Sequence, residues 1–327
     1  MAGEKRQFIR GLHNLKPGRG GCVATIGSFD GVHLGHRAIL QQLIDKSAEY
    51  DLPSVAMIFE PQPQEFFSGE QAPARLMRLR EKVEAFIEAG VDQVFCLQFN
   101  RSLRSLSAED FVDQVLVSGL NVSCLVVGDD FRFGHDRSGN YQLLTQAGKQ
   151  HDFEVLDTHT LEYLGERISS TRIRHALEQA DFGLAEKLLG KPFKIAGRVV
   201  YGQRLGRKLG IPTANVHLQR YRAPLTGVYV VEVLWNGQCL PAVANVGIRP
   251  TVGDLIKPVL EVHILDFDEQ LYGQRIQVEF KAKVREEAKF SSLEIMVDEI
   301  HNDITVARSF FSNEQKVFEQ REDVREK

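Results

Sequence analysis

The sequence predicts two domains of different fold class, an α/β domain followed by an antiparallel β-barrel with a terminal helix. From about residue 20 to 180, short apolar runs alternate with segments of helical period, which is typical of a doubly wound parallel sheet. From about residue 195 the period changes to two, as expected for half-buried antiparallel strands. The length of 327 residues also favours two domains, because one hydrophobic core rarely grows that large.

In the first half, each predicted strand is a short apolar run. The runs are residues 22–26, 55–59, 94–97, 124–127 and 153–156. Ile39, Leu40, Leu43 and Ile44 share one face of a helix between the first two runs. Further on, Ser107 to Asp110 reads as a capping box, and the helix that follows it is predicted to stop at Gly119.

In the second half, residues 276–284 alternate strictly between apolar and polar, which predicts a long strand. Asn236-Gly237 separates runs 228–235 and 238–243 and predicts a β-hairpin. A closing helix is predicted to be capped by Ser291 and Glu294. Its apolar face comprises Leu293, Met296, Val297, Ile300 and Ile304.

We place the domain boundary so that residues 1–184 form the first domain and residues 185–327 the second. Leu184, Ala185, Leu188 and Leu189 have the spacing of a connecting helix rather than of a loose linker.

Composition excludes several classes of function. The formal net charge of −4 provides no sequence-wide basic field for nucleic acid. No apolar run is long enough to cross a membrane, and the start lacks a signal peptide, so a cytoplasmic protein is expected. The four cysteines are scattered singly and are expected to be reduced and buried; they are Cys22, Cys96, Cys124 and Cys239. The oligomeric state stays open.

The segment from Gly27 to His36, Gly-Ser-Phe-Asp-Gly-Val-His-Leu-Gly-His, follows the first predicted strand and precedes a helix. Glycines let backbone N–H groups approach a phosphate, a helix N-terminus favours anions, and two histidines can donate hydrogen bonds to triphosphate oxygens. The alternative is an ordinary glycine-rich turn with two exposed histidines. The position of the H-x-G-H pattern between strand and helix favours the phosphate site.

Four other segments have a structural alternative beside a functional one. Residues 168–174 contain a serine that can cap a helix, yet Arg174 adds a fixed positive charge that suits an anion site. Residues 128–134 could be a turn with a core phenylalanine. Residues 197–215 could be a flexible basic loop, and residues 260–264 could be a strand with Glu261 and His263 on its solvated face.

Taken together, these motifs resemble the bifunctional riboflavin kinase/FAD synthetase family, whose first domain is a Rossmann-like nucleotidyltransferase of the HIGH superfamily. The resemblance runs from about residue 20 to residue 305. It implies that His33 and His36 are catalytic and contact the phosphates of ATP. It further implies a set of ATP-binding residues in the first domain, namely Gly27, Phe29, Asp30, Gly31, Ser170, Thr171 and Arg174. Asp130 and Phe131 would belong to a flavin or nucleotide loop.

In the second domain, the resemblance makes Glu261 the base for the 5′-hydroxyl of riboflavin. The ATP loop would contain Gly197, Gly206, Arg207, Thr213 and Asn215, and the oxygen atoms of Thr213 and Asn215 suit Mg²⁺. Asn245 and Arg285 would contact the flavin. Gln62 and Gln203 stand where the family often has a histidine and an acidic residue, so neither receives a role.

The implied function is phosphorylation of riboflavin to FMN in the second domain and adenylylation of FMN to FAD, with release of pyrophosphate, in the first. ATP is the co-substrate of both steps. Three alternatives stay open: a nucleotidyltransferase for another phosphate acceptor, a flavin-binding protein without turnover, and an RNA-binding synthetase relative. The kinase-like half, the intact motifs and the net charge respectively argue against them.

Overall fold

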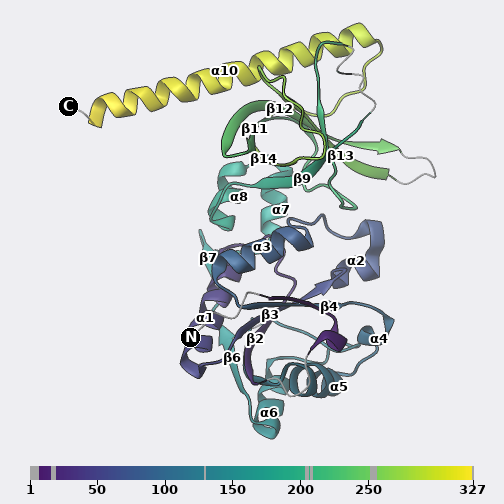
Figure 1. The fold of residues 1–327 in the computed structure, drawn as a ribbon, viewed down its shortest axis with the longest axis vertical. Coiled ribbons are helices and arrows are strands. Elements are labelled where there is room, and N and C mark those ends of the chain that lie inside the picture. The colour runs from purple at the N-terminus through teal and green to yellow at the C-terminus, as the bar shows by residue number, and fades with distance from the viewer. Residues whose placement is uncertain are drawn as a thin grey trace. The chain divides into compact units, whose positions relative to one another are not determined.

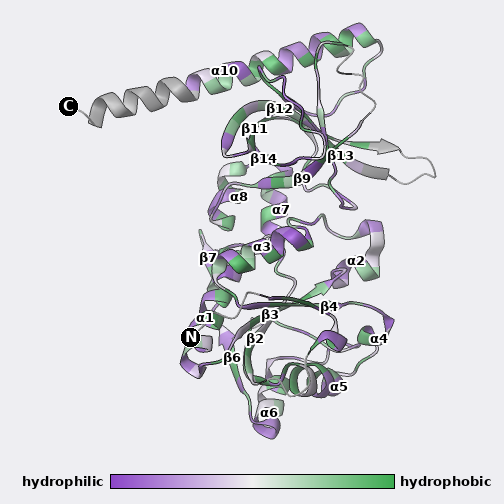
Figure 2. Cartoon of the chain, viewed as in Figure 1, coloured by the Kyte–Doolittle hydropathy of each residue, from purple (hydrophilic) through white to green (hydrophobic). Residues whose placement is uncertain are grey.

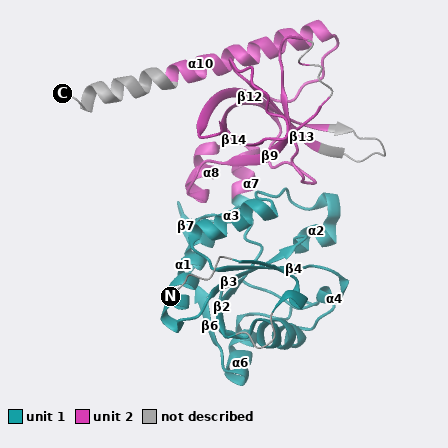
Figure 3. Ribbon diagram, in the orientation of Figure 1, with its two compact units in different colours: residues 1–172 teal, residues 173–327 magenta. Residues whose placement is uncertain are grey.

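The computed structural model describes residues 7–15, 20–128, 130–202, 206, 209–250 and 256–325. The contacts divide the chain into two compact units, Met1–Arg172 and Ile173–Lys327, shown in Figure 3. Each unit contains one of the two predicted fold classes (Figure 1).

A parallel sheet of six strands forms the centre of the first unit, in the order β1-β4-β3-β2-β5-β6. The strands are β1 (Gln7–Arg10), β2 (Cys22–Ile26), β3 (Ser54–Glu60), β4 (Gln93–Gln98), β5 (Val122–Gly128) and β6 (Glu154–Thr158). In this order, β3 and β4 lie on one side of β2, whereas β5 and β6 lie on the other. This change of side at β2 confirms the predicted doubly wound arrangement. The edge strand β1 was not predicted, because it is short and largely exposed.

Helices cover both faces of this sheet. They are α1 (Leu34–Tyr50), α2 (Pro63–Ser68), α3 (Leu79–Ala89), α4 (Arg101–Arg104), α5 (Ala108–Phe111), the π-helix η3 (Val112–Leu120) and α6 (Tyr141–His151), with 3-10 turns η1 (Leu12–Asn14) and η2 (Gly69–Gln71). A small hairpin, β7 (Glu162–Tyr163) and β8 (Glu166–Arg167), precedes α7 (Ser170–Glu178).

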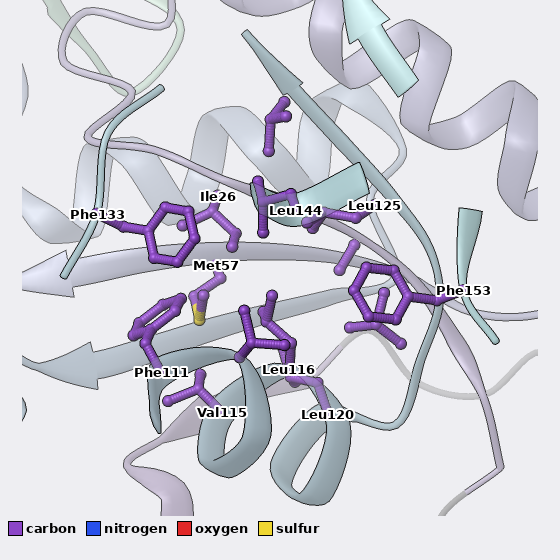
Figure 4. Packing of buried hydrophobic residues seen from close by; sticks show 14 of the residues in the cluster. Ile26, Met57, Phe111, Val115, Leu116, Leu120, Leu125, Phe133, Leu144 and Phe153 are labelled. Atoms are coloured by element: carbon purple, nitrogen blue, oxygen red, sulfur yellow. The ribbon is translucent and has the colours of Figure 1, made fainter. Parts of the chain in front are cut away.

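Two separate cores lie on the two faces. One face packs on α1 and α3 through residues such as Leu40 and Phe86. On the other, Figure 4 shows Met57 from the sheet facing Phe111 and Leu116 from α5 and η3. Because both faces are covered, the strands are apolar along nearly their whole length, which is why their positions could be predicted.

The helix after the capping box ends later than predicted. Ser107 does cap it, since its Oγ accepts from the N–H of Asp110 at 2.9 Å. However, η3 continues through Gly119 to Leu120, and Asn121 ends it in the left-handed region with φ 51°. A side chain at position 119 would meet the carbonyl of Gln114 at 2.9 Å and Leu12 at 3.0 Å. Gly119 therefore permits close packing and is not a helix stop.

The second unit is built on a closed antiparallel barrel of six strands, in the order β10-β13-β12-β11-β14-β9. The strands are β9 (Lys194–Val200), β10 (Ala214–Val216), β11 (Gly227–Trp235), β12 (Gln238–Pro250), β13 (Ile256–Ile264) and β14 (Arg275–Arg285). Asn236 and Gly237 form the predicted hairpin turn with φ 49° and 78°. The predicted barrel and long last strand are confirmed.

Helix α8 (Phe182–Leu189) belongs to the barrel unit, because Phe182 packs edge-on against Tyr229 and stacks with Phe280. The predicted boundary between residues 184 and 185 falls inside this helix, whereas the contacts divide the chain after Arg172. The position of the functional boundary stays a prediction.

The last helix, α10 (Leu293–Arg325), lies against the barrel through Ile304, Ala307, Phe310 and Phe311. Hydrophobic and hydrophilic residues alternate along its described part (Figure 2). Its cap is Ser292, whose Oγ accepts from the N–H of Ile295, so the prediction of Ser291 was wrong by one residue. Leu293, predicted to lie on the apolar face, is exposed because it stands in the first turn, before the helix reaches the barrel core.

Three of the four cysteines are buried free thiols, as predicted, but Cys239, the second residue of β12 after the hairpin turn, is exposed. None of the described helices combines the length and apolar composition needed to span a membrane.

We expect Leu116→Ala to destabilise the first unit by about 2–5 kcal/mol, because Leu116 is fully buried in the sheet–helix core. Urea unfolding followed by far-UV circular dichroism measures this change. Trp235, the single tryptophan, lies in the barrel and reports the second unit by fluorescence. Leu164→Ala, at a site 80% exposed, is the control. Equal stability of both variants would contradict the core assignment.

Candidate active sites

The first candidate site is the turn between β2 and α1. Gly31 has φ 89°, and Phe29 and Val32 also have positive φ, so the backbone is sharply folded. The ring of Phe29 is buried edge-on against Phe86, with ring centroids 5.2 Å apart. A side chain at Gly27 would lie only 3.0 Å from the Phe29 ring. This packing fixes the path of the turn.

His33 and His36 stack at the end of the turn, with ring centroids 3.6 Å apart. His33 caps α1, since its Nδ1 accepts from the N–H of His36 at 3.3 Å. The Nδ1 atom of His36 is buried without a hydrogen-bond partner among the described residues. Burial, followed by the charges of His33, Lys82 and Arg167, holds the pKa of His36 well below its ordinary value. His36 is therefore neutral at neutral pH.

Asp30 holds this turn to a second loop. Its buried carboxylate accepts from the backbone N–H groups of Leu76 at 3.1 Å and Met77 at 3.0 Å. The side chain therefore points into the protein, where it ties the turn to the segment of Leu76 and Met77.

The helix start at Ser170 comes to the same turn from far along the chain. The Oγ of Ser170 donates to the carbonyl of Asp30 at 2.8 Å. Ser169 is the residue that caps the helix, because its Oγ accepts from the N–H of Arg172. Thr171 is exposed, and Arg174 is half-buried one turn further along α7, beyond the division between the units. The predicted motifs at residues 27–36 and 168–170 therefore meet.

The remaining predicted residues of the first unit lie nearby on loops. Asp130 is exposed and pairs with Arg167 at 2.9 Å, and Phe131 stacks on Phe133. Gln62 is buried at the start of α2, and its Nε2 has no hydrogen-bond partner among the described residues.

Sequence analysis missed Lys82 and Arg167, whose charges act on His36. Lys82 occupies an ordinary helical position in the sequence, and its burial depends on tertiary packing that no local pattern shows.

The second candidate site is a cavity of about 300 Å³ beside the barrel. β10 pairs with β13 so that Asn215 lies opposite Glu261, and Thr213 precedes Asn215 on the same face. As predicted, Glu261 and His263 lie on the face of β13 opposite the buried Leu260 and Val262. The predicted residues that line the cavity are Gly206, Thr213, Asn215, Asn245, Glu261 and Arg285.

The cavity is also lined by an ion pair, Arg285 with Asp303, and by the amide of Asn245. Arg285 makes two hydrogen bonds of 2.8 Å to the buried carboxylate of Asp303 on α10. Burial raises the pKa of Asp303, and the Arg285 charge opposes this shift. The Oδ1 of Asn245 is buried without a partner among the described residues, so it is available to a donor on a ligand. Asp303 was not predicted, because its role depends on contact between distant segments.

Two glycines in and just after β9 pack closely on β10 and the residue that follows it. A side chain at Gly197, in β9, would meet the carbonyl of His217 at 3.1 Å, and one at Gly202 would meet the side-chain amide of Asn215. Glycine at these two positions therefore permits the close approach. Arg207 and Gln203 lie outside the described residues.

A further cavity of about 310 Å³ shares Thr213 with the first. Tyr272 lines it and stacks on Tyr201, with ring centroids 4.1 Å apart. Thr213 thus stands between two adjoining cavities, one containing Glu261 and one with an aromatic wall.

Comparisons with known proteins match the two halves separately. The FAD synthetase family model matches residues 16–172, and the riboflavin kinase model matches residues 189–311. A bifunctional riboflavin kinase/FMN adenylyltransferase of Pseudomonas fluorescens is 56% identical, over 93% of this chain and 97% of the relative. The protein of that name from Escherichia coli K12 is 50% identical, over 93% and 98%.

A solved structure, described as a macrolide-efflux protein from Streptococcus pneumoniae, has 30% sequence identity and a TM-score of 0.75. The match covers 92% of this chain and 98% of that one. That description concerns the solved protein, and it names neither of the activities in which the family models and the two relatives agree.

We expect Asp303→Ala to destabilise the barrel unit by roughly 3 kcal/mol, because it leaves Arg285 without its buried partner. Urea unfolding followed by Trp235 fluorescence measures this change. Asp266→Ala is a matched control, since Asp266 makes the same two-bond pair with Arg308 but is exposed. We expect little change there. A similar result for both variants would contradict the anchoring role of Asp303.

Proposed function

Since the chain belongs to the bifunctional riboflavin kinase/FMN adenylyltransferase family, we propose that its two candidate sites divide the two reactions between them. The protein is an enzyme that phosphorylates riboflavin with ATP to give FMN, and then adenylylates FMN with ATP to give FAD and pyrophosphate. We assign phosphoryl transfer to the cavity beside the barrel and adenylyl transfer to the turn between β2 and α1.

One observation supports the kinase assignment above all. Strand pairing and packing bring Thr213, Asn215, Glu261 and Arg285 around one cavity, although they are far apart in sequence. In our proposal, Glu261 accepts the proton of the riboflavin 5′-hydroxyl as its oxygen bonds to the γ-phosphorus of ATP. The bond between that phosphorus and the β–γ bridging oxygen breaks, and ADP leaves.

The residues present fit a magnesium ion. Thr213 and Asn215 offer hard oxygen donors on one face of the chain, at the same cavity as Glu261, and Mg²⁺ prefers such donors. When bound, Mg²⁺ would neutralise charge on the ATP phosphates. Thr213 and Asn215 would position it, and Glu261 would act on the hydroxyl.

The two adjoining cavities suggest where each substrate binds. Glu261 lines only one of them, so we place riboflavin there, with the unpartnered Asn245 Oδ1 and Arg285 available to its polar groups. We place the base of ATP in the cavity with the aromatic wall at Tyr272. The phosphates then pass Thr213, which borders both cavities.

In the first unit, we propose that His33 and His36 contact the phosphates of ATP. A phosphate oxygen of FMN bonds to the α-phosphorus, the bond to the α–β bridging oxygen breaks, and pyrophosphate leaves. The neutral imidazole of His36 can donate a hydrogen bond to a phosphate oxygen as charge develops there. We assign Ser170 and Asp30 to fixing the turn, since both contact backbone atoms.

We also propose a cytoplasmic location. Both reactions consume ATP, and Cys22, Cys96 and Cys124 are buried free thiols, as is usual in a reducing compartment.

Glu261→Gln keeps the shape of the side chain but removes its basicity. We expect the rate of FMN formation from riboflavin to fall about 10²- to 10⁴-fold, while FAD formation from supplied FMN stays normal. Chromatography of the flavin products measures both reactions. Glu232→Gln is the control, because Glu232 lies on β11 and pairs with Lys281 outside the cavity. Loss of both reactions in a folded variant would contradict the two-site assignment.

His36→Ala should have the opposite effect. We expect riboflavin to be converted to FMN at the normal rate, with FAD formation slowed about 10²- to 10³-fold, because a donor to the developing phosphate charge is removed. His301→Ala, at an exposed position on α10, serves as the control. FAD formation at the normal rate in the His36 variant would exclude this histidine from the reaction.

A further inference from the structure

Lys82 is a charged side chain in an unusual place. It lies on α3, is 1% exposed, and its Nζ donates a hydrogen bond to the backbone carbonyl of Ser28. A buried ammonium group loses its hydration, and burial lowers the pKa of Lys82. Lysine is rarely buried this completely, so the position needs an explanation beyond packing.

Lys82 and Asp30 hold the same turn by different atoms. Lys82 contacts the carbonyl of Ser28, and the Asp30 carboxylate contacts the N–H groups of Leu76 and Met77 on the segment leading to α3. The turn that ends at His33 is thus fixed to the start of α3 at two points, the backbone carbonyl of Ser28 and the side chain of Asp30.

The segment leading to α3 is itself held by ion pairs of Arg75. Arg75 pairs with Glu60 at 2.8 Å, at the end of β3, and with the buried Glu65 of α2. Asp30, Glu60 and Glu65 favour the charged form of Lys82, whereas Arg75 opposes it. The three carboxylates therefore offset part of the desolvation of the buried Lys82 ammonium group.

On the other side of the turn is the histidine pair. The charged or titratable groups that act on His36 are His33 from its own segment, Lys82 from α3 and Arg167 from β8. Burial is the largest cause of the lowered pKa of His36, and all three groups add to it by disfavouring a positive charge on the imidazole. A polyphosphate bound beside these groups would offset their positive charge.

We propose that Lys82 is a positioning residue for adenylyl transfer: it fixes the histidine turn through Ser28 and supplies positive charge beneath the place where the ATP phosphates bind. The ammonium group is too deeply buried to touch the substrate and acts through His36 and the turn. This inference rests on the proposed role of His36.

Lys82→Met removes the charge and keeps most of the side-chain stem. We expect the KM for ATP in FAD formation to rise roughly tenfold, with riboflavin phosphorylation unchanged in the same protein. Lys46→Met is the matched control, since Lys46 lies on α1 at the surface and pairs with Glu49.

A second readout separates charge from packing. In ¹³C-histidine NMR, with His36 assigned from the His36→Ala variant, we expect His36 to titrate at higher pH in Lys82→Met than in wild type, because one opposing charge is gone. The acid limb of the pH profile for FAD formation should move in the same direction. Lys82→Arg keeps the charge and should leave the His36 titration near its wild-type pH.

Unchanged FAD formation in a folded Lys82→Met variant would overturn the proposal. Loss of activity with an unmoved His36 titration would overturn it too, since Lys82 would then be only structural. If Lys82→Met fails to fold, the same NMR titration is made on the wild-type protein with and without a non-hydrolysable ATP analogue. We expect the analogue to move the His36 titration to higher pH, and no movement would refute the proposed positive charge beside His36. Normal FAD formation in His36→Ala would refute the site assignment itself.

Discussion

The pairing of β10 with β13 is the constraint on which the kinase chemistry depends. It places Asn215 opposite Glu261 and leaves Leu260 and Val262 on the buried face of the same strand. Strand side chains alternate between faces, so a slip of one residue would exchange Glu261 for an apolar neighbour. The apolar core of the barrel therefore sets the register, and the register sets the position of the proposed base relative to the proposed magnesium ligands.

In the first unit, side-chain contacts rather than strand register fix the position of the site. Its turn carries both histidines and has several residues with positive φ, which a free loop would not maintain. Lys82 and Ser170 hold the turn at its backbone carbonyls from two other segments, and the turn's own Asp30 accepts from the backbone N–H of Met77. These contacts hold the segment in which the rings of His33 and His36 stack, with centroids 3.6 Å apart.

Local patterns could be predicted from the sequence, whereas long-range contacts could not. The buried strands, the Asn236-Gly237 hairpin and the Ser107 cap follow from period and turn chemistry, so they were recognised. Lys82 and Asp303 were missed, because each becomes meaningful only when packing brings it to a distant group. Gly119 was misinterpreted, since its need for a small residue comes from the Gln114 carbonyl of the π-helix together with the distant Leu12.

A time course of the wild-type protein with riboflavin, ATP and magnesium tests the central claim most directly. Chromatography with fluorescence detection separates riboflavin, FMN and FAD. Two sites acting in sequence predict that FMN appears first, without a lag, and that FAD follows as FMN accumulates. FAD without intermediate FMN, or no flavin product at all, would contradict the assignment of the two reactions to two separate sites.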